Sequence, residues 1–323
     1  MQCLKCKASV QIGDRFCEEC GAPLTTPRLS PIISQGCSKC GAQAEAIDAE
    51  GYCSYCGFRN DIQNSDRIEI NLQPHLGGVS DRGLKHRSNE DYLTCAEIRE
   101  KNAFILVVCD GVSSSQSPEL AAKAAAEGAC QALMATVERE KTPCSHSWQE
   151  GMKQAIASAQ MAVCAVPYRD VEDPPSTTII AAVVQNGIAT IGWLGDSRAY
   201  WISSQGAKLL TQDDSWLNDM IASGEMTEQE AINSAKAHVI TRWLGADVEK
   251  DPEPSLITFE IPGSGYLLLC TDGFWNYAPE AEQIAQLLEP SAGKDSVVIA
   301  RNLVEFALSQ GGRDNITVSL LSL

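Results

Sequence analysis

Three strongly apolar segments of this 323-residue chain each end at an aspartate. The segments FILVVCDG (104–111) and YLLLCTDG (266–273) end in Asp-Gly pairs, at Asp110 and Asp272, and IGWLGD (191–196) ends at Asp196. A fourth aspartate, Asp314, stands just before an apolar run near the C-terminus. One Asp-Gly pair after an apolar run is usually only a turn. The repetition makes a shared site the better interpretation.

Carboxylates that meet at the ends of buried strands repel one another and lose hydration. Both effects are costly unless nearby cations neutralise the charge. Hard divalent cations such as Mg²⁺ and Mn²⁺ prefer oxygen ligands. If the four aspartates converge, the sequence therefore predicts a site for divalent ions.

The main part of the chain mixes short apolar runs with helical segments. The runs outnumber the helices and cluster as hairpins. Asn186-Gly187 lies between two of the runs and is a strong signal for a tight hairpin. Thr227 to Glu230 form a capping-box pattern that opens a helix, and Ser117-Pro118 fits another helix start. We expect strands near 104–109, 179–184, 188–194, 198–202, 256–261, 266–270 and 316–321, and helices near 118–140, 146–166, 280–289 and 294–309. Neighbouring hairpins without crossover helices predict an α+β fold with antiparallel sheets and helices outside.

The net charge of −17 argues against nucleic-acid binding through bulk electrostatics. The first thirty residues show no apolar core behind basic residues, which predicts no signal peptide. No segment approaches 18 uninterrupted apolar residues, so no membrane span is expected. We therefore expect a cytoplasmic protein without persistent disulfides.

Eight of the fourteen cysteines form four Cys-x-x-Cys pairs within the first 56 residues. Each set of two pairs offers four thiolates, enough for a closed tetrahedral zinc cage, and both sequential and crossed pairings fit. A disulfide framework or a redox Cys-x-x-Cys is the alternative. These segments resemble bacterial zinc ribbons and predict structural Zn²⁺. The proposed zinc ligands are Cys3, Cys6, Cys17, Cys20, Cys37, Cys40, Cys53 and Cys56.

The cysteine pairs and the charge also suggest how the chain is divided. Residues 1–60 carry six basic and six acidic side chains, so the excess negative charge lies beyond them. A nucleic-acid finger would normally be basic, which favours a protein as the partner of the ribbons. We expect zinc ribbons at 1–24 and 37–60, linkers at 25–36 and 61–74, and a main domain at 75–323.

Eight motifs stand in the order typical of one family: SDRGLKHRSNED, VVCDGV, STT, GDSRAY, LLTQDDS, ITRWLG, LLLCTDGFW and GGRDNITV. Together they resemble the metal-dependent serine/threonine protein phosphatases, the PPM or type 2C family, over about residues 75–323. The resemblance implies a sandwich of two antiparallel sheets flanked by helices. It also implies hydrolysis of phosphoserine and phosphothreonine by water at a dinuclear Mn²⁺ or Mg²⁺ centre, with phosphoproteins as substrates and a serine/threonine kinase as a possible opposing partner.

The resemblance also implies roles for individual residues. Asp110 bridges two ions, the Gly111 carbonyl binds one of them, and Asp272 and Asp314 complete the pair of sites. The remaining acidic residues are secondary: Glu90 and Asp91 act mainly through water, and Asp196 belongs to an additional, weaker metal site shared with Asp272.

Two departures from the family pattern concern the phosphate and the proton donor. His86 occupies the place of the usual phosphate-binding arginine, and Arg87 follows it. Adjacent residues on a strand face opposite sides, so we favour His86 as the phosphate neighbour over Arg87. Val112 and three serines follow Asp110-Gly111, where relatives often have Met-Gly-Gly or a histidine, so no general acid is assigned.

Residues 213–236 match the flap beside the cleft of bacterial relatives. The role of this segment is either substrate selection or plain packing, and the sequence favours neither. The competing hypothesis for the whole chain is a catalytically silent phosphatase fold that recruits partners through its zinc ribbons. Retention of the complete acidic set, including Asp91, Asp110 and Asp314, counts against it.

Overall fold

The computed structural model describes residues 42–43, 46, 54–56, 66–139, 145–169, 172–245, 253–291 and 293–323. The chain divides into two units, residues 1–64 and 65–323. All of the predicted zinc ligands except Cys56 lie outside the described residues, as do most of the predicted ribbons and the linker between them. The fold that follows is that of the second unit.

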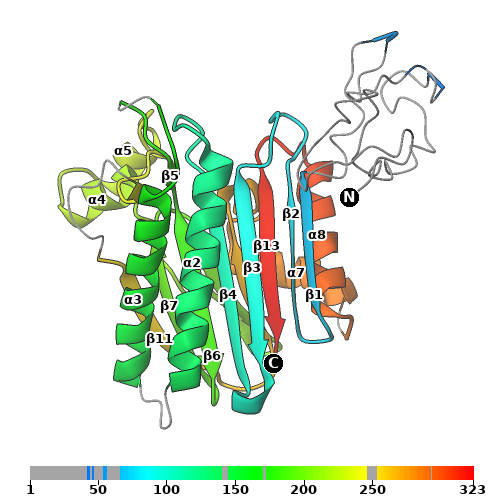
Figure 1. Cartoon of the computed structure of the whole chain (residues 1–323), viewed down its shortest axis with the longest axis vertical. Coiled ribbons are helices and arrows are strands. Elements are labelled where there is room, and N and C mark those ends of the chain that lie inside the picture. Colours follow the sequence, from blue (N-terminus) through cyan, green and yellow to red (C-terminus); the bar gives the residue numbers. More distant parts are fainter. Residues whose placement is uncertain are drawn as a thin grey trace, which may run out of the picture. The chain divides into compact units, whose positions relative to one another are not determined.

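Two antiparallel sheets form the centre of this unit (Figure 1). The six-stranded sheet has the order β1 (Arg67–Leu72), β2 (Leu76–Asp81), β13 (Ile316–Ser322), β12 (Tyr266–Cys270), β8 (Arg198–Ser203) and β9 (Gly206–Leu209). The five-stranded sheet has the order β11 (Ser255–Glu260), β7 (Ile188–Leu194), β6 (Ile179–Gln185), β4 (Ala103–Asp110) and β3 (Asp91–Ile98). A short ladder joins β5 (Ser176–Thr177) to β10 (Leu244–Gly245).

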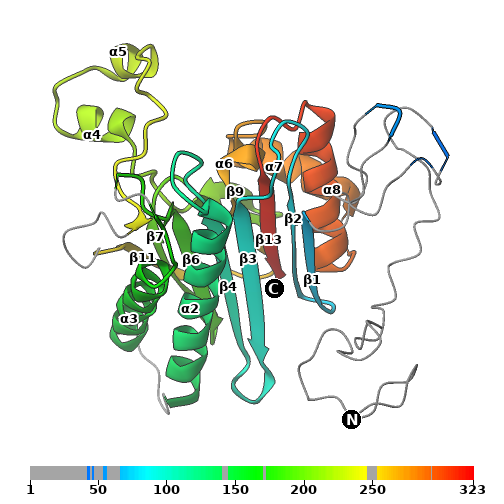
Figure 2. The same cartoon turned by 45° about the horizontal axis from the view of Figure 1, so that its top comes forward.

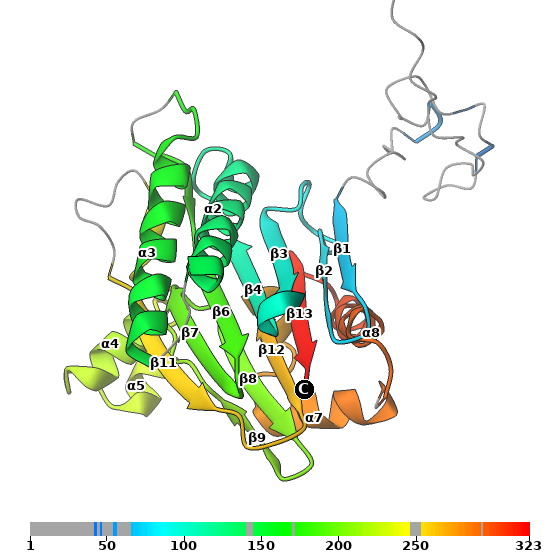
Figure 3. The same cartoon turned by 60° about the horizontal axis from the view of Figure 1, so that its bottom comes forward.

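Helices cover the outer face of each sheet, as Figures 1 and 3 show. The helices are α2 (Pro118–Arg139), α3 (Ser145–Cys164), α4 (Trp216–Ala222), α5 (Glu228–Ile232), α6 (Asp272–Trp275), α7 (Ala281–Leu288) and α8 (Ser296–Ser309), with 3-10 turns at Arg99–Lys101 and Glu289–Ser291. Helices α2 and α3 lie on the five-stranded sheet, and α6, α7 and α8 lie on the six-stranded one. None of the helices in the described ranges is long and apolar enough to cross a bilayer.

Three apolar clusters hold the layers together. The middle cluster lies between the sheets and includes Leu93 and Leu106 from one sheet and Leu267 and Leu321 from the other. The two outer clusters lie between each sheet and its helices. The central strands of the sheets are buried on both faces and are therefore apolar nearly throughout. β6 (IIAAVVQ), for example, is buried along its whole length.

The predicted α+β sandwich of antiparallel sheets is confirmed, together with its helical flanks. The capping box at Thr227 and Glu230 opens α5 as expected. Asn186 and Gly187 both have positive φ, 53° and 76°, as a type I′ hairpin between β6 and β7 requires. Strands β1, β2, β3 and β9 were not among the expected strands, because their polar and glycine residues weaken the apolar signal.

One predicted boundary needs correction. Residues 61–74 were expected to be a linker, but β1 (Arg67–Leu72) lies within that range and pairs with β2 along its whole length. Arg67 also forms ion pairs with Asp81 and Glu305, at 3.0 Å each. The main unit therefore begins before residue 75.

Candidate metal centre

Two of the predicted site residues come from neighbouring strands of the five-stranded sheet. Asp91 begins β3, Asp110 ends β4, and the two are direct partners in the antiparallel register. The Asp110 carbonyl accepts a hydrogen bond from the Thr178 amide at 2.8 Å, and the Gly111 amide donates to the Glu90 carbonyl at 3.1 Å. These contacts fix the end of β4 on both sides, so the Asp110 side chain has a defined position.

The other sheet supplies Asp272 and Asp314. Asp272 is the first residue of α6, one residue after the end of β12, and Asp314 precedes β13, which pairs with β12. Gly273 allows the two segments to approach each other, since a Cβ at this position would collide with the Asn315 carbonyl oxygen. The Asp-Gly pair is therefore required by packing as well as by the turn.

Carboxylates from the two sheets lie close together, and the pKa values of Asp110, Asp272 and Asp196 are raised. Burial raises the pKa of Asp110 well above its usual range, and the charges of Asp91, Asp272, Asp196 and Asp314 raise it further. Burial and Asp314 raise the pKa of Asp272 to about 6, while its hydrogen bond with Asp110 opposes the shift. Burial, followed by the charge of Asp272, raises the pKa of Asp196 to about 7. Like charges this close, with little water, favour bound protons or cations.

Asp91 is 2% exposed and is held by the opposite sheet. Thr271 and Thr317 donate hydrogen bonds to its Oδ2 atom, at 2.9 and 2.7 Å. Its Oδ1 atom is buried and has no hydrogen-bond partner in the described part of the chain. Burial raises the pKa of Asp91 to about 8, although the two hydroxyl groups oppose the rise.

The two threonines were not predicted as site residues. Thr271 directly precedes Asp272, and this position beside an aspartate at a strand end could have identified it from the sequence. Thr317 is the second residue of β13 and gave no signal in the sequence.

His86 lies beside the carboxylate centre. The Nε2 atom of His86 is 3.1 Å from Oδ1 of Asp314, and the His86 side chain is 28% exposed. Arg87 is exposed. Residues 82–90 form a loop between β2 and β3 and not a strand, so the expectation that adjacent side chains face opposite sides rested on a wrong premise. The loop itself directs His86 inward.

Asn315 holds this loop in place and was also missed. Its side-chain amide donates to the carbonyl oxygens of Arg82 and Ser88, at 2.8 and 3.1 Å, and its oxygen accepts the Glu90 amide at 2.8 Å. The Glu90 carboxylate accepts a hydrogen bond from the Ser113 hydroxyl. One asparagine next to Asp314 thus organises the backbone that carries His86 and Glu90.

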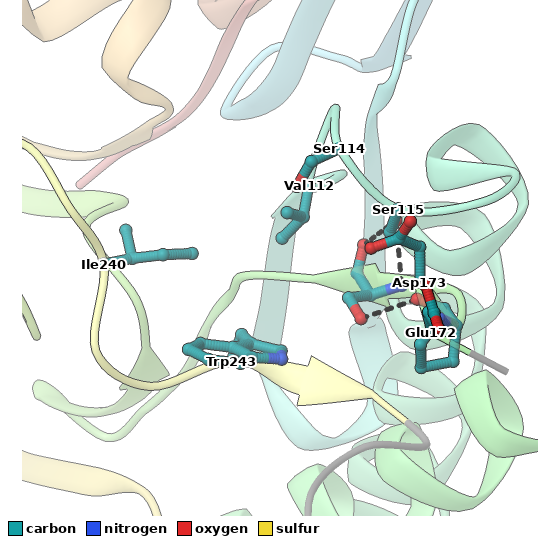
Figure 4. A pocket seen from close by; sticks show the side chains of 9 residues that line it. Val112, Ser114, Ser115, Glu172, Asp173, Ile240 and Trp243 are labelled. Carbon is teal, nitrogen blue, oxygen red and sulfur yellow. Dashed lines mark hydrogen bonds between the residues drawn. The ribbon is translucent and has the colours of Figure 1, made fainter.

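A hollow of about 240 Å³ opens beside the loop that follows Asp110-Gly111. Figure 4 shows Val112 and Ser114 on one side of it, Ile240 and Trp243 on another, and Asp173 and Glu172 on a third. The Val112 amide donates to the Ser176 carbonyl at 2.9 Å, which ties this wall to the strand next to Asp110.

The comparisons with known proteins agree with this geometry. Residues 82–306 match the family model described as protein phosphatase 2C, and residues 3–57 match the double zinc ribbon. The chain is 28% identical over 254 residues to serine/threonine phosphatase stp of Listeria innocua, covering 76% of this chain and 95% of that protein. It is 25% identical over 247 residues to protein phosphatase PhpP of Streptococcus pneumoniae, covering 76% and 96%.

Solved structures show the same fold. Serine/threonine phosphatase Stp1 from Staphylococcus aureus superposes with a TM-score of 0.66 and 26% identity, covering 79% of this chain and 97% of that one. PstP/Ppp from Mycobacterium tuberculosis gives a TM-score of 0.61 and 25% identity, covering 80% and 98%. With two sheets that bring five aspartates together, and a family match over most of its length, the chain belongs to the protein phosphatase 2C family.

Proposed function

We propose that the second unit hydrolyses phosphoserine and phosphothreonine in proteins, and that its aspartates hold two Mn²⁺ or Mg²⁺ ions with a weaker third ion at Asp196. The family match supports protein serine/threonine phosphatase activity. The single observation that carries the metal assignment is the convergence of Asp110, Asp272 and Asp314. The charges of Asp272 and Asp314 raise the pKa of Asp110, and the charge of Asp314 raises the pKa of Asp272.

The donor set fits hard divalent cations. Its members are carboxylates, and the orphaned Oδ1 atom of Asp91 gains a partner if a cation or its hydration water occupies the centre. Among the described residues, no three histidine, cysteine, aspartate or glutamate side chains are close enough to hold one ion by themselves. The remaining ligands would be the Gly111 carbonyl and water, as is usual for Mg²⁺.

When bound, such ions would supply an activated water and positive charge for the phosphoryl oxygens. The protein's own residues then have definite tasks. Asp110 and Asp272 keep their carboxylates in place through the packed strand ends. Thr271 and Thr317 fix Asp91, and the Nε2 atom of His86 lies beside Asp314. If Asp314 turns to a bound cation, a phosphate oxygen would replace it as the acceptor of the His86 N–H group.

The alternative is a catalytically silent protein that binds phosphoproteins and recruits partners through its zinc ribbons. We expect the full chain, with Mn²⁺, to release inorganic phosphate from a phosphothreonine peptide in many turnovers, because the acidic set is complete. The assay measures phosphate against time in molar excess of peptide. If calorimetry detects binding of the peptide but no phosphate is released, the result would favour the scaffold and contradict the proposal.

The contacts of His86 support it as the phosphate neighbour. We expect His86→Ala to raise KM for a phosphothreonine peptide about tenfold or more, because one hydrogen bond to a charged group contributes about 1.5–3 kcal/mol. Arg87→Ala is the matched control, since its side chain is exposed, and should change KM less than twofold. A larger rise in Arg87→Ala than in His86→Ala would reverse the assignment.

For the N-terminal unit we propose two closed zinc cages, which the double zinc ribbon match supports. We also propose that they bind a protein partner, because residues 1–60 carry no basic excess. Elemental analysis of protein purified under reducing conditions should give about two zinc ions per chain, because each four-thiolate set closes one cage. A Cys3→Ser/Cys6→Ser variant should lose about one zinc, whereas Cys164→Ser, outside the ribbon segments, should lose none. Protein without zinc would contradict the ribbon assignment.

A further inference from the structure

The hollow of about 240 Å³ beside the carboxylate centre is bounded by three segments of the chain, at residues 112–115, 172–176 and 240–243. Hydrogen bonds join the first two segments. The Val112 amide donates to the Ser176 carbonyl at 2.9 Å, and the Ser176 amide donates to the Ser115 hydroxyl group at 3.2 Å. The Gln116 amide donates to the Asp173 carbonyl at 3.0 Å. The backbone on both sides of the hollow therefore has a fixed position.

The third segment is fixed by the short ladder between β5 and β10. Trp243 directly precedes β10, whose Gly245 pairs with Ser176 in the antiparallel register. The Gln160 side chain of α3 holds Gly245 from both directions. Its amide donates to the Gly245 carbonyl at 2.8 Å, and its oxygen accepts the Gly245 amide at 3.0 Å. Trp243 is thus attached to the same strand that carries the second segment.

Ile240 completes the third segment and stands just after the flap. It forms an isolated antiparallel bridge with Ser215, at the start of the flap. Figure 2 shows the flap helices α4 and α5 extending away from the sheets. Among the described residues that line the hollow, none belongs to α4 or α5. The hollow is therefore a feature of the sheet ends and not of the flap helices.

The hollow lies within two residues of the carboxylate centre. Val112 follows Asp110-Gly111, and Gly111 forms an isolated bridge with Thr177 of β5. An extended chain advances about 3.3–3.6 Å per residue, so the Cα atoms of Asp110 and Val112 are at most about 7 Å apart. A substrate residue one or two positions from the phosphoresidue spans the same distance.

The size and the chemistry of the hollow suit a basic side chain. Pockets for small-molecule ligands usually measure about 300–1,000 Å³, so this smaller hollow fits a single side chain better. Val112, Ile240 and Trp243 supply apolar surface, and Glu172 and Asp173 supply carboxylates (Figure 4). No described residue of its lining is basic. A lysine or arginine can lay its apolar stem against the first group and place its cation beside the second, where an aromatic ring also attracts it.

We propose that the hollow binds an arginine or lysine side chain of the substrate, one or two residues from the phosphoresidue, and that Asp173 and Glu172 determine this preference. This inference rests on the proposed function, which places the phosphoresidue at the carboxylate centre. It names the substrate class as phosphoproteins with a basic residue close to phosphoserine or phosphothreonine. The net charge of −17 attracts basic proteins in general, whereas the hollow selects the position of the basic residue.

A set of phosphothreonine peptides tests the position. Arginine is placed in turn at each position from two residues before to two residues after phosphothreonine, and in one peptide several residues farther away. Citrulline, which has the same shape without the charge, and norleucine, which is apolar, replace it in matched peptides. The full chain with Mn²⁺ is assayed for kcat/KM. At the position that reaches the hollow, we expect arginine to exceed citrulline and norleucine about tenfold, because one exposed ion pair contributes up to about fivefold and the hollow offers two carboxylates.

Substitutions at Asp173 test the acidic wall. The Asp173 side chain is exposed and has no ion pair within the described ranges of the chain. Asp173→Asn should lower the ratio of kcat/KM between the arginine and citrulline peptides to about threefold or less, and Asp173→Lys should favour glutamate over arginine at the same position. Glu282→Gln is the matched control, because it removes an exposed carboxylate from α7, on the six-stranded sheet, and should keep the wild-type ratio. A change in the fraction of folded protein alters both peptides equally, so the ratio separates selection from stability.

Three results would overturn the inference. The first is an equal gain from arginine at every position that Asp173→Asn leaves unchanged, since general attraction by the negative charge explains it. The second is no gain from arginine at any position. The third is a norleucine peptide as good as the arginine peptide, which would make the hollow a purely apolar site.

Failure of the proposed function gives a separate result, because the wild type would then release no phosphate from any of the peptides. Calorimetry with the same peptides still tests the hollow in that case. Tighter binding of the arginine peptide than of the citrulline peptide, lost in Asp173→Asn, would support the inference. Equal binding of the two peptides would overturn it.

Discussion

Asp272→Asn should reduce kcat/KM for a phosphothreonine peptide roughly 10³-fold or more, equivalent to about 4 kcal/mol of transition-state stabilisation. Asp272 lies against Asp110 and Asp314 at the point where the two sheets meet. Asparagine keeps the shape of the side chain but removes the charge that holds a divalent cation, so the ions needed to activate water bind poorly. Steady-state phosphate release at saturating Mn²⁺ measures the loss.

The same substitution should leave the fold intact, and it should stabilise the metal-free protein above pH 7. Removing one of several buried like charges relieves repulsion that lowers the free energy of unfolding. Glu282→Gln on the exposed side of α7 is the control, and it should leave both turnover and melting temperature unchanged. Normal turnover in Asp272→Asn would contradict the role of this residue in the centre.

Complete removal of divalent ions should abolish phosphate release and make stability depend strongly on pH. Burial raises the pKa of Asp91 to about 8, of Asp196 to about 7 and of Asp272 to about 6. Because the folded metal-free protein holds protons that the unfolded chain releases, its free energy of unfolding falls as pH rises between about 4 and about 8. The melting temperature of chelated protein should therefore be higher at pH 5.5 than at pH 8.

Mn²⁺ should restore the free energy of unfolding that the metal-free protein loses as pH rises. Its effect should be strongest at pH 8, where protons no longer compete for the carboxylates. At a concentration 100 times its Kd, an ion that binds only the folded state adds about 2.7 kcal/mol. For a domain of this size, that corresponds to a rise of roughly 5–11 °C in melting temperature. Scanning calorimetry at the two pH values, with and without Mn²⁺, measures the effect.

The chelator also removes zinc, so one arm of this experiment restores Zn²⁺ alone. Zn²⁺ should refill the ribbons, whereas phosphate release should return only with Mn²⁺ or Mg²⁺. Metal-free Asp272→Asn should show a weaker dependence of melting temperature on pH than the wild type. Phosphate release that persists without any divalent ion would refute the metal mechanism.

Much of the fold could be predicted from the sequence because its signals are local. The apolar runs that became β4, β6, β7, β12 and β13 are buried on both faces, so each carries a continuous hydrophobic signal. The Asn186-Gly187 turn specifies its hairpin through the φ angles of two residues. The strands that were missed include β2. Its Gly77 lies against Val297 and its Gly78 against Leu93, so closely that a side chain would not fit at either position.

The candidate site was predicted less completely, since its supports act between distant segments. The aspartates were visible as interruptions of apolar runs, but Thr317 and Asn315 gave no comparable signal. The position of His86 was decided by a loop whose backbone Asn315 holds, and not by the alternation of a strand.

The sequence alone determined which segments become strands, which glycines allow tight turns, and that several carboxylates end those strands. These features depend on residues within a few positions of one another. Only the tertiary structure decided that Asp91 is held by threonines of the opposite sheet and that His86 lies beside Asp314. Such contacts exist only once the two sheets are packed, because packing alone brings residues more than 100 positions apart within hydrogen-bonding distance.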